Sequence, residues 1–186
     1  MSYVSAMHDR MLACMIIPCR VVAVDLAAAR LRVSDGSGWT SAWLRWHAQA
    51  AGKARHWRAP TLGEQGVLLS PSGELAQGTF IPGLYGNAGL PPAQLDHTEV
   101  WQFEDGGSLT YDWQARRYDI QLPSGTVSIK VGASSVEISD DAITLKAAAI
   151  RLIGNVVIDG PLSVSGDINS GGRVIDTAGN TANHKH

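Results

Sequence analysis

The chain has 186 residues, a formal net charge of −2 and a sequence pI near 6.3, so nucleic acid or an anionic membrane surface is disfavoured as its main partner. The length allows one large domain or two small ones. No stretch approaches the eighteen or more apolar residues of a membrane-spanning helix, and His8, Asp9 and Arg10 interrupt the apolar run that a signal peptide would need. Cys14 and Cys19, the only cysteines, lack a second pair to complete a zinc site and are expected to be reduced thiols.

The first segment of the chain is expected to be helical. Three methionines and Leu12 recur at helical spacing within residues 3–17, which predicts a short amphipathic helix. Pro18 is expected to end this helix, because proline cannot donate the backbone hydrogen bond that a continuing helix requires.

Five short β-strands are predicted between residues 19 and 85. Alternating apolar residues in "RVVAVDLAAARLRV" predict two strands joined by a turn, and "DGSG" at 35–38 predicts a tight turn. A third strand is predicted in "WTSAWLRWH", and two more flank a turn at Ser72-Gly73. Five strands in about 70 residues favour a small closed barrel, because such a sheet must close or pack to cover its apolar face.

The second half of the chain has a different pattern. Residues 86–98 contain glycine and proline without periodicity, which predicts a linker. A hairpin is predicted over Asp105-Gly106-Gly107, followed to about residue 168 by short alternating segments whose centres recur every seven to nine residues. This repeat, which has no helical periodicity, is typical of a solenoid.

The repeated segments place apolar side chains on one face and polar side chains on the other. Leaving about twenty aliphatic side chains in water would forfeit about 1.5–3 kcal/mol each, and no other part of the chain remains to cover them. Three copies wrapped around one axis would bury every inward face, so the sequence predicts a homotrimer. The residues expected to point inward are Ile120, Ile129, Ile138, Leu145 and Leu152.

The chain ends in His184-Lys185-His186. In an extended strand the side chains at i and i+2 share a face, so the two imidazoles would lie parallel and Lys185 would point away. Two imidazoles are too few for a metal site. Three parallel chains would bring six of them together at the end of the axis, which is an octahedral set.

We expect no enzyme activity and no catalytic residues. The adjacent carboxylates Glu104-Asp105 and Asp140-Asp141 would point to opposite faces of a strand, so neither pair could converge on a substrate, and turn positions are expected for both. The histidines before the terminal pair have no serine, cysteine or aspartate arranged around them in a catalytic triad order.

Four tryptophans interleaved with arginines in the predicted barrel leave two interpretations open. Aromatic rings beside basic side chains are typical of barrels that bind single-stranded nucleic acid. Tryptophans of small barrels also pack in the core or form subunit contacts, and the net acidic charge favours a contact with neighbouring proteins. The residues are Trp39, Trp43, Trp46, Trp57, Arg45, Arg55 and Arg58.

Several of these stretches together resemble one known family. "RVVAVD", "GKARHWRAPTLGEQGVLLSPSGELAQGTFIPGLY", the "FEDGGSLTYD" hairpin and the terminal "HKH" are similar to the phage baseplate assembly protein V family. These proteins are the spikes of contractile phage tails and of R-type bacteriocins such as pyocins. The resemblance covers the chain from about Arg20 to His186.

The resemblance implies an all-β fold in which an OB-fold barrel is followed by an intertwined, trimeric, triple-stranded β-helix that tapers to a metal-bound tip. The expected organisation is an N-terminal helical segment (1–18), the barrel (19–85), a linker (86–98), the trimeric β-helix (99–170) and the tip with its HxH motif (171–186). For the tip, the resemblance implies one iron ion per trimer, held by His184 and His186 of three chains.

The resemblance also implies a function. The protein would be a membrane-piercing spike, assembled in the bacterial cytoplasm, placed at the virion baseplate and in contact with tail tube and hub proteins. It would breach the outer membrane of the target bacterium when the sheath contracts. An alternative is an oligonucleotide- or oligosaccharide-binding barrel on a trimerising β-stalk, and a third is a receptor-binding fibre. For the spike, no nucleic-acid partner is expected.

Overall fold

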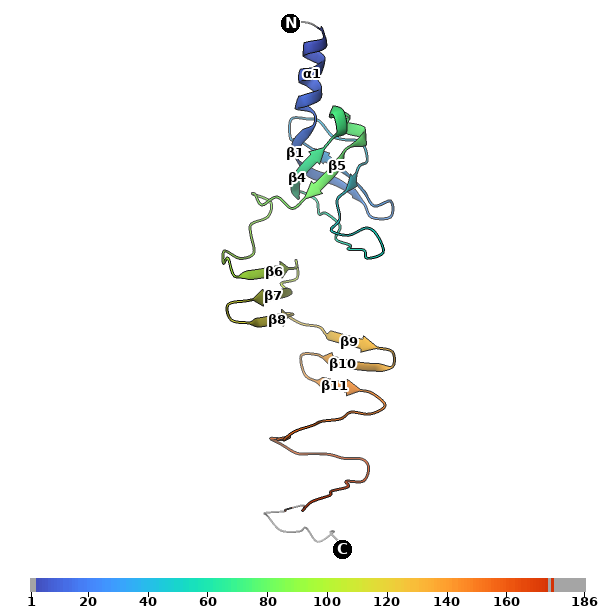
Figure 1. Ribbon diagram of the computed structural model, residues 1–186, viewed down its shortest axis with the longest axis vertical. Helices are drawn as coiled ribbons and strands as arrows, with labels where there is room; N and C mark the ends of the chain where they lie inside the picture. The colour runs from blue at the N-terminus through green and yellow to red at the C-terminus, as the bar shows by residue number, and fades with distance from the viewer. Residues whose placement is uncertain (1–2, 174, 176–186) are drawn as a thin grey trace. The chain divides into compact units, whose positions relative to one another are not determined.

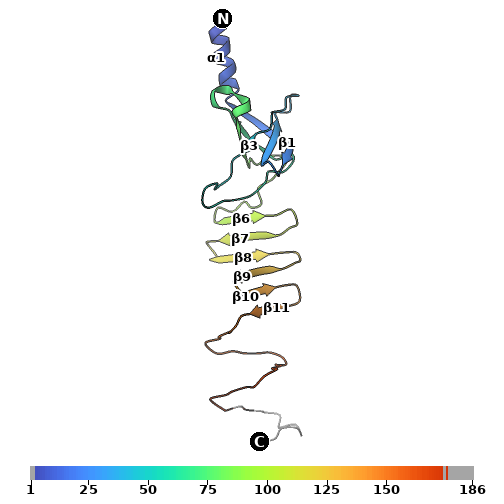
Figure 2. The ribbon, with the colours of Figure 1, turned by 90° about the vertical axis from the view of Figure 1, so that its right-hand side faces the viewer.

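The computed structural model describes residues 3–173 and residue 175, and Figure 1 and Figure 2 show it from two directions. The chain divides into two compact units, the first ending at Pro123 and the second beginning at Ser124. Among the described residues, the regular structure is one helix, one five-stranded sheet and two three-stranded sheets, with two 3₁₀ turns. The predicted all-β class, with a short N-terminal helix, is confirmed. In the described part of the chain, no helix has the length and apolar character needed to span a bilayer.

The first unit is built on a five-stranded sheet with the order β2-β1-β4-β5-β3. Its strands are β1 (Ile16–Asp25), β2 (Arg30–Ser34), β3 (Arg45–Trp46), β4 (Gln65–Leu69) and β5 (Thr79–Pro82). The β3–β5 pair is parallel and the other pairs are antiparallel. Two 3₁₀ turns, Pro71–Gly73 and Leu75–Gln77, connect β4 to β5. The third strand, predicted over nine residues, is only two residues long.

A single bridge nearly closes this sheet into a barrel. Leu44, the residue before β3, lies opposite Leu31 of β2, and two backbone hydrogen bonds join them with N···O distances of 2.9 and 2.8 Å. The two outer strands of the sheet are thereby connected, as expected for a small sheet that must cover its own apolar face.

The barrel interior is a compact apolar core. Phe80 of β5 is fully buried, and its ring lies over Gly66 of β4, where a Cβ atom would fall 2.6 Å from Phe80 Cε2. Both cysteines are free, and burial raises the pKa of the Cys19 thiol to about 11, so this thiol is neutral at physiological pH. The buried apolar residues are Cys19, Val21, Leu31, Val33, Leu44, Leu68 and Phe80.

Helix α1, Tyr3–Ala13, ends earlier than the sequence predicted. Because β1 begins at Ile16, Pro18 lies inside a strand and does not end the helix. At Pro18, β1 pairs with β4 alone, since its pairing with β2 starts at Arg20. A proline is tolerated on such a half-paired stretch because one strand edge there needs no N–H donor.

Two antiparallel three-stranded meanders follow the barrel in the chain, one in each unit (Figure 1). The predicted hairpin over Asp105-Gly106-Gly107 joins the first two strands, and Phe103 N donates to Gly107 O at 2.9 Å across its turn. The strands are β6 (Thr98–Gln102), β7 (Ser108–Asp112) and β8 (Arg117–Gln121), then β9 (Val127–Val131), β10 (Ser134–Ile138) and β11 (Ile143–Lys146).

The predicted strand segments beyond β11 are not strands within one chain. Over the described residues 147–173, no strand is assigned, although the alternation of apolar residues continues. A strand requires a hydrogen-bonded neighbour. In an intertwined β-helix that neighbour belongs to another copy, so a single chain shows these segments unpaired.

Candidate functional site

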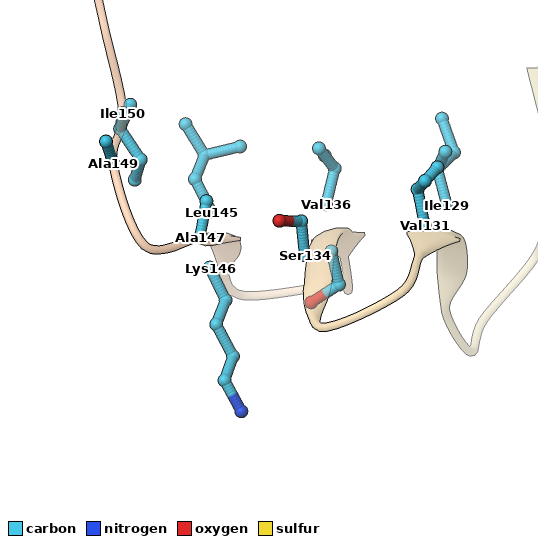
Figure 3. A pocket seen from close by; sticks show the side chains of 10 residues that line it. Ile129, Val131, Ser134, Val136, Leu145, Lys146, Ala147, Ala149 and Ile150 are labelled. Atoms are coloured by element: carbon cyan, nitrogen blue, oxygen red, sulfur yellow. The ribbon is translucent and has the colours of Figure 1, made fainter.

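One face of the β9–β11 sheet is apolar. Residues directly opposite each other in a ladder share a face, and Val136 lies opposite both Ile129 and Leu145. In Figure 3 the side chains of these three residues point to the same side of the ribbon. With the two-residue alternation of each strand, this face carries Ser134 and the apolar residues Val127, Ile129, Val131, Val136, Ile138, Ile143 and Leu145.

The opposite face of this sheet is polar. Lys130 Nζ lies 3.3 Å from Glu137 Oε1, and Lys146 points away from Leu145 in Figure 3. The Lys130–Glu137 pair is well exposed, so it is worth only about 0–1 kcal/mol. The polar face is therefore suited to water, whereas the apolar face is not.

No described residue of the chain covers the apolar face. Ile129 is 62% exposed and Ile143 is 71% exposed. A hollow of about 270 Å³ runs along this face, lined in part by Ile129, Val136, Leu145 and Ile150. Covering such side chains gains about 1.5–3 kcal/mol each, so this surface strongly favours association.

The β6–β8 sheet also has one predominantly apolar face, which is rich in aromatic residues. Trp101 lies opposite Leu109, which lies opposite Ile120, and Tyr111 lies opposite Tyr118 with ring centroids 6.2 Å apart. A hollow of about 140 Å³ on this face is lined by Glu99, Trp101, Leu109, Tyr111 and Tyr118. Glu99 is the one carboxylate of this lining, and its Oε1 accepts a hydrogen bond from Trp101 Nε1 at 3.0 Å.

The residues predicted to point inward divide between these surfaces. Ile129, Ile138 and Leu145 share the apolar face of β9–β11, as expected, whereas Ile120 lies on the β6–β8 face in the other unit. Leu152 is 67% exposed and lies in the segment without strand pairing. All five side chains are exposed in a single chain.

The tryptophans and arginines of the barrel make separate local contacts. Trp39 and Trp46 pack against the barrel core, and the ring of Trp46 lies 5.6 Å from that of Trp57. Arg45 Nε donates to the Thr79 hydroxyl at 3.0 Å, and Arg55 Nε to Gly52 O at 3.4 Å. These guanidinium groups are therefore engaged locally, while Trp43 and Trp57 remain exposed and available for a protein contact.

The third arginine is held by a carboxylate. Arg58 forms a two-pronged ion pair with Glu64, and the Thr61 amide also donates to Glu64 Oε2 at 3.0 Å. Burial alone would raise the pKa of the Glu64 carboxyl, but the Arg58 guanidinium and the Thr61 amide outweigh it and hold the pKa below its ordinary value. The Arg58–Glu64 ion pair and the Thr61 hydrogen bond together fix the loop that leads into β4.

Two histidine contacts were not foreseen from the sequence. His97 Nδ1 lies 3.1 Å from Asp112 Oδ1, and its ring meets Trp113 edge-on at 6.4 Å. The Ala115 amide, together with His97, lowers the pKa of Asp112. His56 contacts Trp101 edge-on, with ring centroids 6.2 Å apart. These contacts join residues far apart in sequence, so no local pattern could have indicated them.

The predicted metal ligands His184 and His186 lie outside the described residues. Within residues 3–173 and 175, no three or more histidine, cysteine, aspartate or glutamate side chains are grouped so that they could hold a metal ion. The metal site therefore stays a prediction that rests on the chemistry of its donors.

The adjacent carboxylates occupy the predicted turn positions. Glu104-Asp105 lies in the turn between β6 and β7, and Asp140-Asp141 in the bend between β10 and β11. Asp105 Oδ1 accepts from the Gly107 amide, and Asp141 Oδ1 accepts from the Ser139 hydroxyl. Their described hydrogen bonds shape these turns.

Comparison with known proteins gives one match over the barrel and a second match over the part of the chain that carries the two meanders. Residues 17–85 match the injector OB domain of type VI secretion systems and phage baseplates. Residues 99–170 match the β-helical trimerization domain named after Gp138. The chain therefore combines an injector-type OB domain with a trimerization domain, and the trimerization match supports the expected homotrimer.

A similar protein of known role defines the family more closely. The chain is 30% identical to the Spike protein of Escherichia phage P2, in an alignment that spans 89% of this chain and 84% of the relative. The chain belongs to the phage baseplate assembly protein V family of tail spike proteins, as its sequence motifs predicted.

Proposed function

We propose that three copies of this chain form the membrane-piercing spike at the tip of a contractile tail. The observation that carries the proposal is the likeness to the phage P2 Spike protein along most of both chains. The uncovered apolar faces of β6–β8 and β9–β11 support it, because three copies around one axis can bury them. The spike is assembled in the bacterial cytoplasm and becomes part of the virion baseplate, where it contacts tube and hub proteins.

The role is mechanical and not catalytic. The barrel attaches the spike to the tail, and the β-helix carries the axial load when the sheath contracts and drives the tip through the outer membrane. Strands shared among three chains resist compression as a unit, because no chain can leave the assembly without exposing its apolar face. The matches to an injector domain and a trimerization domain support these separate roles for the barrel and the β-helix.

We extend the proposal to the tip, where His184 and His186 of three copies hold one iron ion. Imidazole nitrogens suit iron, and three copies supply six of them. When bound, the ion cross-links the three copies. The chain's own part is to present the two neutral imidazoles of His184 and His186, so binding weakens as acid protonates them.

Vesicle puncture tests the proposed function. Tail particles carrying the parent spike should release a trapped dye from outer-membrane vesicles when sheath contraction is triggered. Particles whose sheath cannot contract should release none, although they carry the same spike. Release that is equal with and without contraction, or absent in both, would contradict membrane piercing by this protein.

A further inference from the structure

The hollow on the β6–β8 sheet has the chemistry of a cation site. Three aromatic rings, those of Trp101, Tyr111 and Tyr118, line it together with the Glu99 carboxylate. Aromatic faces attract a lysine or arginine head group electrostatically, and a carboxylate pairs with it. Among the described residues the Glu99 carboxylate has one hydrogen-bond donor, the neutral Trp101 indole.

A trimer makes an unpaired Glu99 costly. The sheet lies in the part of the chain that matches the trimerization domain. Its aromatic face, where Trp101, Tyr111 and Tyr118 are exposed in a single chain, is the one that the proposed trimer would cover. A carboxylate removed from water with a single neutral donor loses solvation that one hydrogen bond does not replace. The covered face therefore needs a cation, and the covering copy must supply it.

The barrel loop of the same unit carries that cation. From Arg45 to Arg58 the chain has four basic residues and no acidic one. An Ala51–Arg55 bridge makes Gly52–Ala54 the tip of this loop, with Lys53 exposed at its end. Arg45, Arg55 and Arg58 have local partners, whereas Lys53 has no ion pair or hydrogen bond within the described part of the chain.

The loop also reaches the level of the hollow. The ring of His56, which follows the tip, contacts Trp101 at a centroid distance of 6.2 Å. Rotation about a three-fold axis keeps every residue at its level along that axis, so the loop of a neighbouring copy reaches the same level. No ion pair joins Lys53 and Glu99 among the described residues of a single chain, which leaves the neighbouring copy as the donor.

We propose that Lys53 of one copy enters the aromatic hollow of the next copy and forms an ion pair with Glu99. This inference rests on the proposed trimer and deepens it, because it names a polar contact that fixes the rotational register of the three copies. Apolar faces alone specify register weakly, whereas a buried charge pair selects one arrangement.

Carbodiimide coupling of the untagged full-length trimer tests the pairing, because the reagent condenses a lysine amine and a nearby carboxylate into an amide. The parent should give cross-linked dimers and trimers on a denaturing gel, with the Lys53 peptide joined to the Glu99 peptide in the mass spectrum. Glu99→Gln and Lys53→Met should abolish that product. Lys53→Arg, which keeps the charge but offers no amine, should abolish it while preserving the trimer's thermal midpoint.

Mixed trimers separate a contact between copies from one within a chain. When Glu99→Gln and Lys53→Met chains are co-expressed, the amide can form only between the intact Lys53 of one chain and the intact Glu99 of the other. Its appearance supports the proposal. Its absence there, or its absence in a parent that light scattering shows to be trimeric, overturns the pairing alone. A monomeric parent overturns the proposed trimer as well.

Discussion

At the scale of single residues, Gly66 limits the size of side chain that the barrel accepts. The ring of Phe80 and the carbonyl of Ile81 occupy the space where a Cβ atom would lie. The φ of Gly66 is not positive, so the close contact, and not an unusual backbone conformation, requires glycine here.

Gly66→Ala should therefore destabilise the barrel. We expect a loss of about 1–3 kcal/mol in the free energy of unfolding, because the added methyl group overpacks a filled core. Urea unfolding followed by tryptophan fluorescence measures this loss. Gly52→Ala is the control, since nothing lies within 4 Å of the added atom, and it should change stability by less than about 0.5 kcal/mol. Equal urea midpoints for Gly66→Ala and Gly52→Ala would contradict the close contact at Gly66.

Glu64 links the stability of the barrel to pH. Its folded-state pKa is lowered, so its ionised form stabilises the fold at neutral pH, and this contribution is lost as the pH falls from about 4.3 through the lower folded pKa. Glu64→Gln should have a lower thermal midpoint than the parent at pH 7. Between pH 5 and pH 3, the thermal midpoint of Glu64→Gln should fall by less than that of the parent. Glu74→Gln, at an exposed position, should follow the parent curve. Parallel curves for the parent and Glu64→Gln would rule this linkage out.

At the scale of elements, the strands of the second half alternate so regularly that one substitution can distinguish their faces. Ile129 lies on the apolar face, where its cross-strand partner is Val136. Ser135 lies on the polar face, opposite Lys130 on one side and Lys146 on the other. The same acidic residue should therefore have opposite effects at these two positions.

Ile129→Asp should abolish the trimer or cause aggregation, because three carboxylates would enter a covered apolar interior at a cost of several kcal/mol each. Ser135→Asp should keep the trimer, since its carboxylate meets two lysines in water. Sedimentation should give the parent and Ser135→Asp a mass near three times that of the 19.8 kDa chain. A trimer of unchanged heat stability in Ile129→Asp would show that this face is not the interface.

Local alternation allowed the strands of both meanders to be predicted, because each pairs with its neighbour in sequence. Prediction from local alternation failed where a strand pairs with a segment that is distant in sequence. The helix was extended to Pro18 because the apolar spacing of the helix runs on into β1, and only the β4 partner shows that Ile16 starts a strand. The Lys53 loop and the Glu99 hollow could not be foreseen, because the contact of His56 with Trp101 joins residues that are 45 positions apart (101 − 56).

At the scale of the whole molecule, the metal content of the spike tests the proposed tip. If six histidines of three copies hold one ion, elemental analysis of untagged protein should find about one third of an equivalent of iron per chain, by the symmetry of the site. The signal should vanish in a His184→Ala, His186→Ala double variant and decline on acidification below about pH 6.5, where imidazoles become protonated. Lys185→Ala is the matched control and should retain the iron. One metal per chain, or iron content untouched by the double variant, would exclude the site.

The barrel and the trimerization domain were recognisable from sequence because both rest on short-range patterns. The pairing of residues 147–173 was not, because alternation shows which side chains share a face but not which chain supplies the neighbouring strand. Family resemblance supplied that information, and the unpaired course of this segment in a single chain agrees with it.

This difference in pairing sets the order in which the spike can form. The hairpins of β6–β8 and β9–β11 have their partners in the same chain, so they can close in microseconds, even while the copies are still separate. Residues 147–173 must wait for three chains to meet, a step whose rate depends on concentration. The paired structure of residues 147–173 should therefore form after the two meanders. Dilution would slow the pairing of residues 147–173 and leave the barrel's own folding rate unchanged.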